Sequence, residues 1–225
     1  EDVFGNIITT NSLDGRPQKI THEYGITTAP DSLNIWGVTG ATETQSSITA
    51  GADLYGTLIK TEAINEEYVC QYGVPVAAKV RIKTNGADLF GAASYQETLS
   101  SYVSGLFTHT NGRSSFVNLS AITETTGSWN EDIFGNSVTL DQGSAFVQAY
   151  GATFDKDGNE IWGVVTAAET RPTITRTTDI FGNVYTTTTS NNNYVCDYGI
   201  PVAAETITKV DSSLNIFGET NSTTS

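Results

Sequence analysis

Apolar and polar residues alternate in short stretches along this chain, and no stretch keeps the 3.6-residue period of an amphipathic helix. In the segment Ala78–Lys83, Val80 and Ile82 would face one side of a strand and the three cationic residues the other. Gly-containing turn sequences separate further strand patterns, which lie at residues 173–177, 184–189 and 205–210. Residues 190–193 predict a loop. The pattern as a whole predicts an all-β fold with little or no helix.

The apolar landmarks of the chain occur twice, in the same order. The longest, Tyr68–Ala78, returns almost unchanged as Tyr194–Ala204. This internal duplication predicts a first β repeat at residues 1–94, an unrepeated segment at 95–130 and a second repeat at 131–225. Because repeated units bury their apolar faces against one another, we expect either an antiparallel or mixed sheet or a sandwich or solenoid-like arrangement. The unrepeated segment is expected to add one or two strands or an extended arm.

An aromatic residue followed by glycine punctuates both repeats. An aromatic ring turned into a core, followed by Gly, is typical of a strand that bends or bulges. We interpret these pairs as structural corners, in preference to a row of aromatic residues lining a sugar-binding groove. They are Phe4-Gly5, Trp36-Gly37, Tyr55-Gly56, Phe90-Gly91, Phe134-Gly135, Trp162-Gly163, Phe181-Gly182 and Phe217-Gly218.

Two prolines lie inside the apolar runs of the long repeated segment. Proline has no N–H to donate to a neighbouring strand, so such runs are expected at sheet edges or bulges. Sheet edges are also the surfaces through which subunits can continue a sheet. The predicted assembly edges are Val74, Pro75 and Val76 in the first repeat and Ile200, Pro201 and Val202 in the second.

The two cysteines, Cys70 and Cys196, occupy equivalent positions in the repeats. If the repeats stack as adjacent strands, equivalent residues lie about 4.7 to 5.5 Å apart, which suits a disulfide. A disulfide within the chain is therefore favoured, with a bridge between subunits and two free thiols as the alternatives. A redox-active pair is not expected, since neither cysteine belongs to a Cys-x-x-Cys motif.

Composition and charge restrict the partners of the chain. The 225 residues include 35 Thr, 19 Ser, 16 Asn and 21 Gly, and the formal net charge is −14. Phosphate backbones would be repelled, which excludes nucleic acid as a partner. A first residue other than Met suggests an exported protein after signal-peptide removal, and no apolar run is long enough for a spanning helix. Sequons at Asn118 and Asn221 are compatible with surface glycans.

Signatures of enzyme chemistry are missing from the sequence. The two histidines, His22 and His109, have no counterpart in the other repeat, and no Gly-x-Ser-x-Gly, Walker or His-Glu-x-x-His motif occurs. No catalytic residues or resident cofactor are therefore predicted. The best ion-binding candidate is a calcium site at Asp155, Asp157, Asn159 and Glu160, although the spacing fits a tight hairpin turn better than a calcium loop.

Together these features favour an extracellular structural protein that assembles with copies of itself through strand edges. The repeated Asp-Ile-Phe-Gly-Asn and Tyr-Val-Cys-x-Tyr-Gly-x-Pro-Val-Ala-Ala units, in an acidic chain that lacks Met, resemble the tubular sheath proteins of filamentous methanogenic archaea. The resemblance implies amyloid-like lateral continuation of sheets, disulfide-hardened tubes and no catalytic residues. A surface layer or a filament would share the same features.

The alternative is a secreted adhesion module that binds carbohydrate or calcium. Duplicated binding modules duplicate their sites, so this hypothesis predicts that Trp36 and Trp162 are both exposed in equivalent surroundings. The assembly hypothesis predicts that both are buried.

Overall fold

The structure, a computed structural model, describes residues 7–9, 16–52, 56–197 and 199–224. These residues form fifteen strands and no helix, which confirms the all-β prediction. In the same residues no helix is long and apolar enough to cross a membrane. The strands are β1 (Ile7–Thr9), β2 (Lys19–Thr28), β3 (Asn34–Gln45), β4 (Ser47–Ala52), β5 (Leu58–Gln71), β6 (Val74–Ala87), β7 (Ala93–Thr108), β8 (Ser114–Glu131), β9 (Ser137–Gln142), β10 (Ala145–Phe154), β11 (Glu160–Thr170), β12 (Thr173–Thr178), β13 (Val184–Asp197), β14 (Ile200–Leu214) and β15 (Thr220–Thr224).

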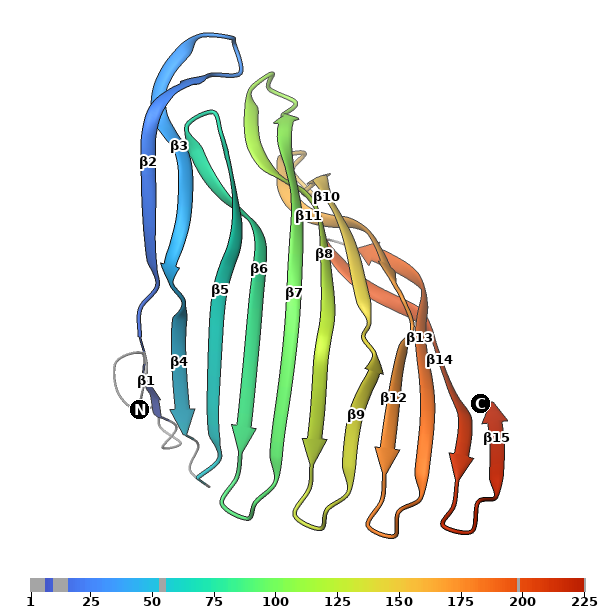
Figure 1. The fold of residues 1–225 in the computed structure, drawn as a ribbon. Helices are drawn as coiled ribbons and strands as arrows, with labels where there is room; N and C mark the ends of the chain where they lie inside the picture. The colour runs from blue at the N-terminus through green and yellow to red at the C-terminus, as the bar shows by residue number, and fades with distance from the viewer. Residues whose placement is uncertain (1–6, 10–15, 53–55, 198, 225) are drawn as a thin grey trace.

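Eleven of the strands lie side by side in one open antiparallel sheet (Figure 1). Their order is β1-β4-β5-β6-β7-β8-β9-β12-β13-β14-β15. Each strand of the second repeat in this sheet lies six positions further along than its counterpart in the first repeat. The duplication therefore extends one sheet sideways, which is the expected antiparallel sheet and not its sandwich or solenoid-like alternative.

Two hairpins lie over the far ends of the long strands and make a second layer there (Figure 1). The β2–β3 hairpin contacts the end of β5–β6, where the Val38 amide donates to the Gly73 carbonyl at 3.1 Å. The β10–β11 hairpin covers β13–β14 in the same way, and the Thr170 hydroxyl donates to the Asn191 carbonyl at 2.8 Å. This layering repeats with the sequence, so it follows from the duplicated pattern.

The core of the molecule is thin. Among the described residues no large side chain is fully buried, and the buried apolar residues are Val38, Ile48, Ala78, Ala121, Ala145 and Val165. The chain exposes 13905 Å², whereas a compact monomer of its mass exposes about 9,900 Å². Much of the apolar surface that a globular protein would bury is thus left accessible in the single chain.

The structure decides two sequence predictions about local structure. Residues 95–130 supply most of β7 and β8, which pair with neighbours on both sides, so this segment contributes two central strands and no arm. Residues 190–193 were expected to form a loop, yet they lie inside β13. Ladder pairing with β14 at Ser190, Asn191 and Asn192 overrides the turn preference of asparagine.

Candidate assembly surfaces

Four of the hairpin turns have the same construction and lie at the same margin of the sheet (Figure 1). In the turn that begins at Asp132, the Gly135 amide donates to the Asp132 carbonyl, and Gly135 has a φ of 91°. This is a type I turn followed by a left-handed residue, a conformation that glycine adopts most readily. The Asp132 Oδ1 atom accepts the Phe134 and Asn136 amides, each at 2.9 Å. The aspartate of the motif therefore shapes the turn.

Asparagine side chains connect three of these turns, those at Asp132, Asp179 and Asn215, into a row. The Asn136 amide group donates to Asp132 Oδ2 at 2.7 Å, while its Oδ1 atom accepts the Ile180 amide of the next turn at 3.0 Å. In the following step, Asn183 Oδ1 accepts the Ile216 amide at 3.2 Å. The hydrogen bond from each asparagine is the main reason that the pKa values of Asp132 and Asp179 lie below the usual range. The row is thus held by bonds between turns as well as within them.

The apolar residues of these turns project into solvent. Phe90, Phe134, Phe181 and Phe217 are 77, 73, 70 and 83% exposed. We call the four rings and the aliphatic residue preceding each one the aromatic ridge; it comprises Leu89, Phe90, Ile133, Phe134, Ile180, Phe181, Ile216 and Phe217. The prediction that these rings turn into a core is wrong, because the margin of a single-layer sheet has no second layer to receive them.

The remaining predicted corners differ from these turns. Trp36-Gly37 and Trp162-Gly163 lie inside β3 and β11, and Gly163 is a bulge with a φ of 85°. Gly56 follows β4 and also has a positive φ, of 82°. Phe4, Gly5 and Tyr55 lie outside the described residues.

Among the residues that the structure describes, the two outer strands of the eleven-stranded sheet pair on one side only. Within the described ranges, β1 pairs only with β4, and β15 pairs only with β14. The predicted edges around Pro75 and Pro201 lie elsewhere, at the hairpin ends, where Pro75 is opposite Cys70 and Pro201 is opposite Cys196. The β6–β7 ladder begins only at Lys79, so the Val74–Ala78 segment is a local edge. Ile200, Pro201 and Val202 likewise precede the β14 pairing with β15.

The two cysteines are free thiols, and the favoured disulfide within the chain is wrong. Five strands lie between β5 and β13, which at about 4.8 Å per strand separates the two by tens of ångströms. Burial raises the pKa of the Cys70 thiol, with a smaller contribution from Glu23. Both cysteines are half-buried, and a bridge between subunits remains a prediction.

The candidate calcium residues serve as a hairpin turn and a clamp. Asp155 Oδ1 accepts the Asp157 and Asn159 amides, each at 2.8 Å, and the Asn159 side chain donates to Asp155 Oδ2. Glu160 points away to the neighbouring hairpin, where its Oε2 atom accepts from the amide and hydroxyl of Thr110. These bonds lower the pKa of Glu160. In the part of the chain that is described, no three acidic, histidine or cysteine residues form a metal-binding group.

His109 joins the same clamp. Its Nε2 atom lies 3.0 Å from the Ser115 hydroxyl, and its Nδ1 atom lies 3.4 Å from Glu160 Oε1. The order of the three groups is that of a hydrolase triad, but both oxygens of Glu160 hold one hairpin end to another. The arrangement connects the β7–β8 and β10–β11 turns. Sequence reasoning missed it, because His109 and Glu160 belong to segments with no recognisable spacing.

The two repeated tryptophans have different surroundings. Trp36 is 73% exposed, whereas Trp162 is half-buried and stacks on Phe107 with a ring-centroid distance of 3.6 Å. His109 also contacts the Trp162 ring edge-on. Neither the equivalent exposure expected of an adhesion module nor the burial expected of an assembly is found for both residues in the single chain.

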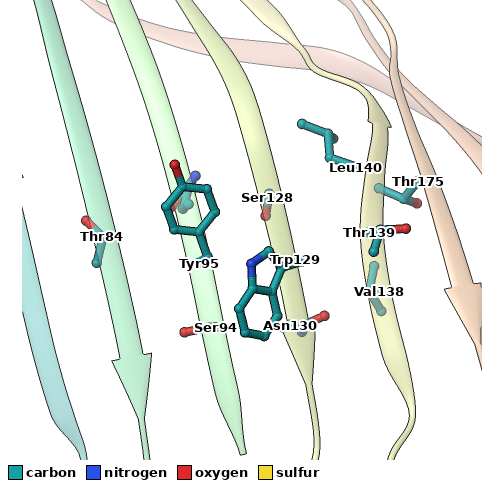
Figure 2. Close-up of a pocket in the computed structure, with 11 residues that line it drawn as sticks. Thr84, Ser94, Tyr95, Ser128, Trp129, Asn130, Val138, Thr139, Leu140 and Thr175 are labelled. Carbon is teal, nitrogen blue, oxygen red and sulfur yellow. The ribbon is translucent and has the colours of Figure 1, made fainter.

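A shallow hollow of about 310 Å³ lies across β6, β7, β8, β9 and β12 (Figure 2). Tyr95 and Trp129 are opposite each other on β7 and β8, and Trp129 is 41% exposed. The Tyr95 hydroxyl donates to Glu97, which also forms an ion pair with Arg81. The other lining side chains are hydroxyl-bearing or amide residues together with Val138 and Leu140, so the hollow combines two aromatic rings with small polar and aliphatic groups.

No protein-family model, curated protein or solved structure matches this chain. The strand edges and the aromatic ridge are the features of the chain that bear on its function.

Proposed function

We propose that this protein is an extracellular structural protein whose copies assemble through strand edges into a sheath, surface layer or filament. The observation that carries the proposal is an open sheet in which, among the described residues, β1 and β15 each pair on one side only. Unpaired strand edges favour pairing with another chain. The surface of the chain exceeds that of a compact monomer by about 4,000 Å², an amount typical of obligate interfaces.

The aromatic ridge supports a second contact in the same assembly. Its eight apolar residues are 50 to 83% exposed and follow one another along a single margin. Exposed apolar side chains gathered along one margin favour an interaction site there. Because the ridge is at the ends of the strands and the free ladders are at their sides, the two surfaces would extend an assembly in two directions.

Electron microscopy of the purified protein tests the proposal directly. At near-physiological salt, negative staining should show regular tubes, sheets or filaments, and dispersed particles under all conditions would contradict it. Parallel samples with chelator and with reductant show whether metal ions or bridges between Cys70 and Cys196 of different subunits contribute.

Proline variants of β1 test whether its free edge forms the contact between copies. Successive amides of a strand point to opposite sides, so Ile8→Pro and Thr9→Pro, made singly, together cover the outward donor of β1. One of them should shorten or abolish the assemblies. Lys156→Pro is the matched control, since it places proline at the turn position that Pro30 occupies in its own hairpin. Equal assembly by all three variants would exclude the β1 edge.

A further inference from the structure

The pairing of strand β8 shows which kind of strand could pair with the free sides of β1 and β2. On one side it pairs with β7, and on the other it pairs with β9 through Trp129–Glu131 and with β10 through Ser120–Glu124. In the first repeat the counterparts of β9 and β10 are β1 and β2. Among described residues β1 pairs only with β4 and β2 only with β3, so both lack a neighbour on the side where β8 would lie.

The other end of the sheet lacks the same strand. By its place after β14 and its turn, β15 is the counterpart of the first part of β7. Strand β7 pairs with β6 on one side and β8 on the other, whereas β15 pairs only with β14 in the described chain. A strand of the β8 type thus fits the free side of β15 as well as the free sides of β1 and β2.

The direction of the strands gives an independent reason to expect one additional strand between β15 of one copy and β1 of another. The eleven strands are antiparallel throughout, so β1 and β15, at the odd positions one and eleven, run in the same direction. Direct pairing of β15 with the β1 of another copy would be parallel, a type of pairing that does not occur among the described strands. One additional strand between them restores the antiparallel order and completes a second set of six.

Side chains on β2 are consistent with this occupant. Lys19 is the counterpart of Ala145, which pairs with Glu124 of β8. An added β8-type strand would therefore place a glutamate opposite Lys19, and opposite charges on facing positions stabilise antiparallel pairs. Tyr24 and Ile26 are 60 and 70% exposed, while their counterparts on β10, Tyr150 and Ala152, are half-buried.

We propose that the margin formed by β1 and β2 is a docking site for a strand of the β8 type, carried by a further unit of the same repeat and paired on its other side with a β15 edge. This inference rests on the proposed function. Because β8 of every copy is already paired on both sides, the docking strand is an unpaired β8-type strand that the further unit brings. The units then join head to tail through a twelfth strand, with the aromatic ridge on the same margin throughout.

A graft on the full chain tests the docking site. Residues 93–130, the β7–β8 hairpin, are fused directly before Glu1, so that the turn sequence Asp2-Val3-Phe4-Gly5-Asn6 follows the graft as Asp132–Asn136 follows β8. We expect hydrogen-exchange protection of the Lys19–Glu23 amides to rise at least tenfold. The grafted copies of Phe107 and His109 should also cover Trp36 and reduce its quenching by iodide.

The control graft carries Ala121→Pro and Thr123→Pro, whose amides lie on the same side of β8 as the Thr125 amide that donates to Ser144, so these changes remove ladder donors that would face β2. No gain in protection with the unmodified graft, or an equal gain with both grafts, overturns the docking site. Electron microscopy of the same samples separates this inference from the proposed function. A docked graft should cap the edge and stop assembly, and if assembly continues, the joint is elsewhere although self-assembly stands. If the ungrafted chain does not assemble, self-assembly fails whether or not the graft docks.

Discussion

Strands β2 and β10 are counterparts in the two repeats, yet their environments differ. Both contain Tyr-Gly, at Tyr24-Gly25 and Tyr150-Gly151, and both form a hairpin that returns through Ile-Trp-Gly-Val. Strand β10 is largely half-buried and also pairs with β8, whereas most of β2 is exposed and pairs only with β3 among the described strands. The neighbouring strand thus decides the burial that similar sequences reach.

The same difference extends to the tryptophans at the hairpins. Trp162 has Phe107 and His109 beside it because the β7–β8 hairpin lies next to the second repeat. Among the described strands β2 pairs only with β3 and has no such hairpin beside it, and Trp36 is 73% exposed. One repeat therefore shows the surroundings that the other would acquire in an assembly.

The largest effect is expected at the junction between β8 and the second repeat. A Cβ atom added at Gly143 would lie 1.6 Å from the Thr125 carbonyl oxygen, beside the 3.0 Å hydrogen bond from the Thr125 amide to Ser144. Gly143→Ala should destabilise the chain by on the order of 3 kcal/mol in urea unfolding. At the control position Gly127 the nearest atom is a Tyr95 side-chain carbon at 3.4 Å, so Gly127→Ala should cost far less. Equal losses would show that β8 does not contact the junction closely.

The second largest loss of stability is expected at Gly37 of β3, compared with its counterpart Gly163 of β11. A Cβ atom at Gly37 would lie 2.5 Å from the Gly73 Cα atom, so Gly37→Ala should separate the two layers and cost about 2 kcal/mol. Its counterpart Gly163 has open space around it and a φ of 85°, so Gly163→Ala should cost only about 1 kcal/mol, from backbone strain. Thermal unfolding of both variants measures the difference, and a reversed order would contradict the layering of β3 on β5–β6.

Truncating the tryptophans should have a smaller and unequal effect. Trp162→Ala removes the stacking on Phe107 and should cost about 2 kcal/mol in the unassembled chain. Trp36→Ala should change stability by less than about 0.5 kcal/mol before assembly. Denaturant unfolding at protein concentrations too low for assembly makes the comparison. A large cost for Trp36→Ala under these conditions would mean that its ring is already covered.

The smallest effect on stability is expected when acid protonates the aspartates of the linked turns. The asparagine bond lowers the pKa of Asp132 in the folded chain, so its stabilising contribution is present above the unfolded-state pKa of about 3.9 and is lost as pH falls through the lower folded value. Asn136→Ala should raise the pKa of Asp132 toward its ordinary value, which a carboxyl NMR titration measures. The turn at Asp88 has Ala92 in place of the asparagine and serves as the natural comparison. An unchanged titration of Asp132 would show that Asn136 does not hold the carboxylate.

The sequence by itself determined the strands, the turns and the duplication. Two-residue alternation, as in Val80 and Ile82, and the fixed Asp-Ile-Phe-Gly-Asn unit act locally, through side-chain direction and through the bonds of a single aspartate. The same local signals predicted that the Pro75 and Pro201 segments lie at edges.

Only the tertiary structure decided how the repeats are placed. The sequence positions of Cys70 and Cys196 are compatible with stacked or with lateral repeats. The pairing of β6, β7, β8, β9 and β12 between β5 and β13 keeps the two cysteines far from each other. The direction of the Phe134 ring, the contact of His109 with Glu160 and the unequal surroundings of Trp36 and Trp162 depend on which strands become neighbours. Such long-range pairings leave no periodic signal in the residues that make them, because a ladder is formed mainly by backbone groups that every residue carries.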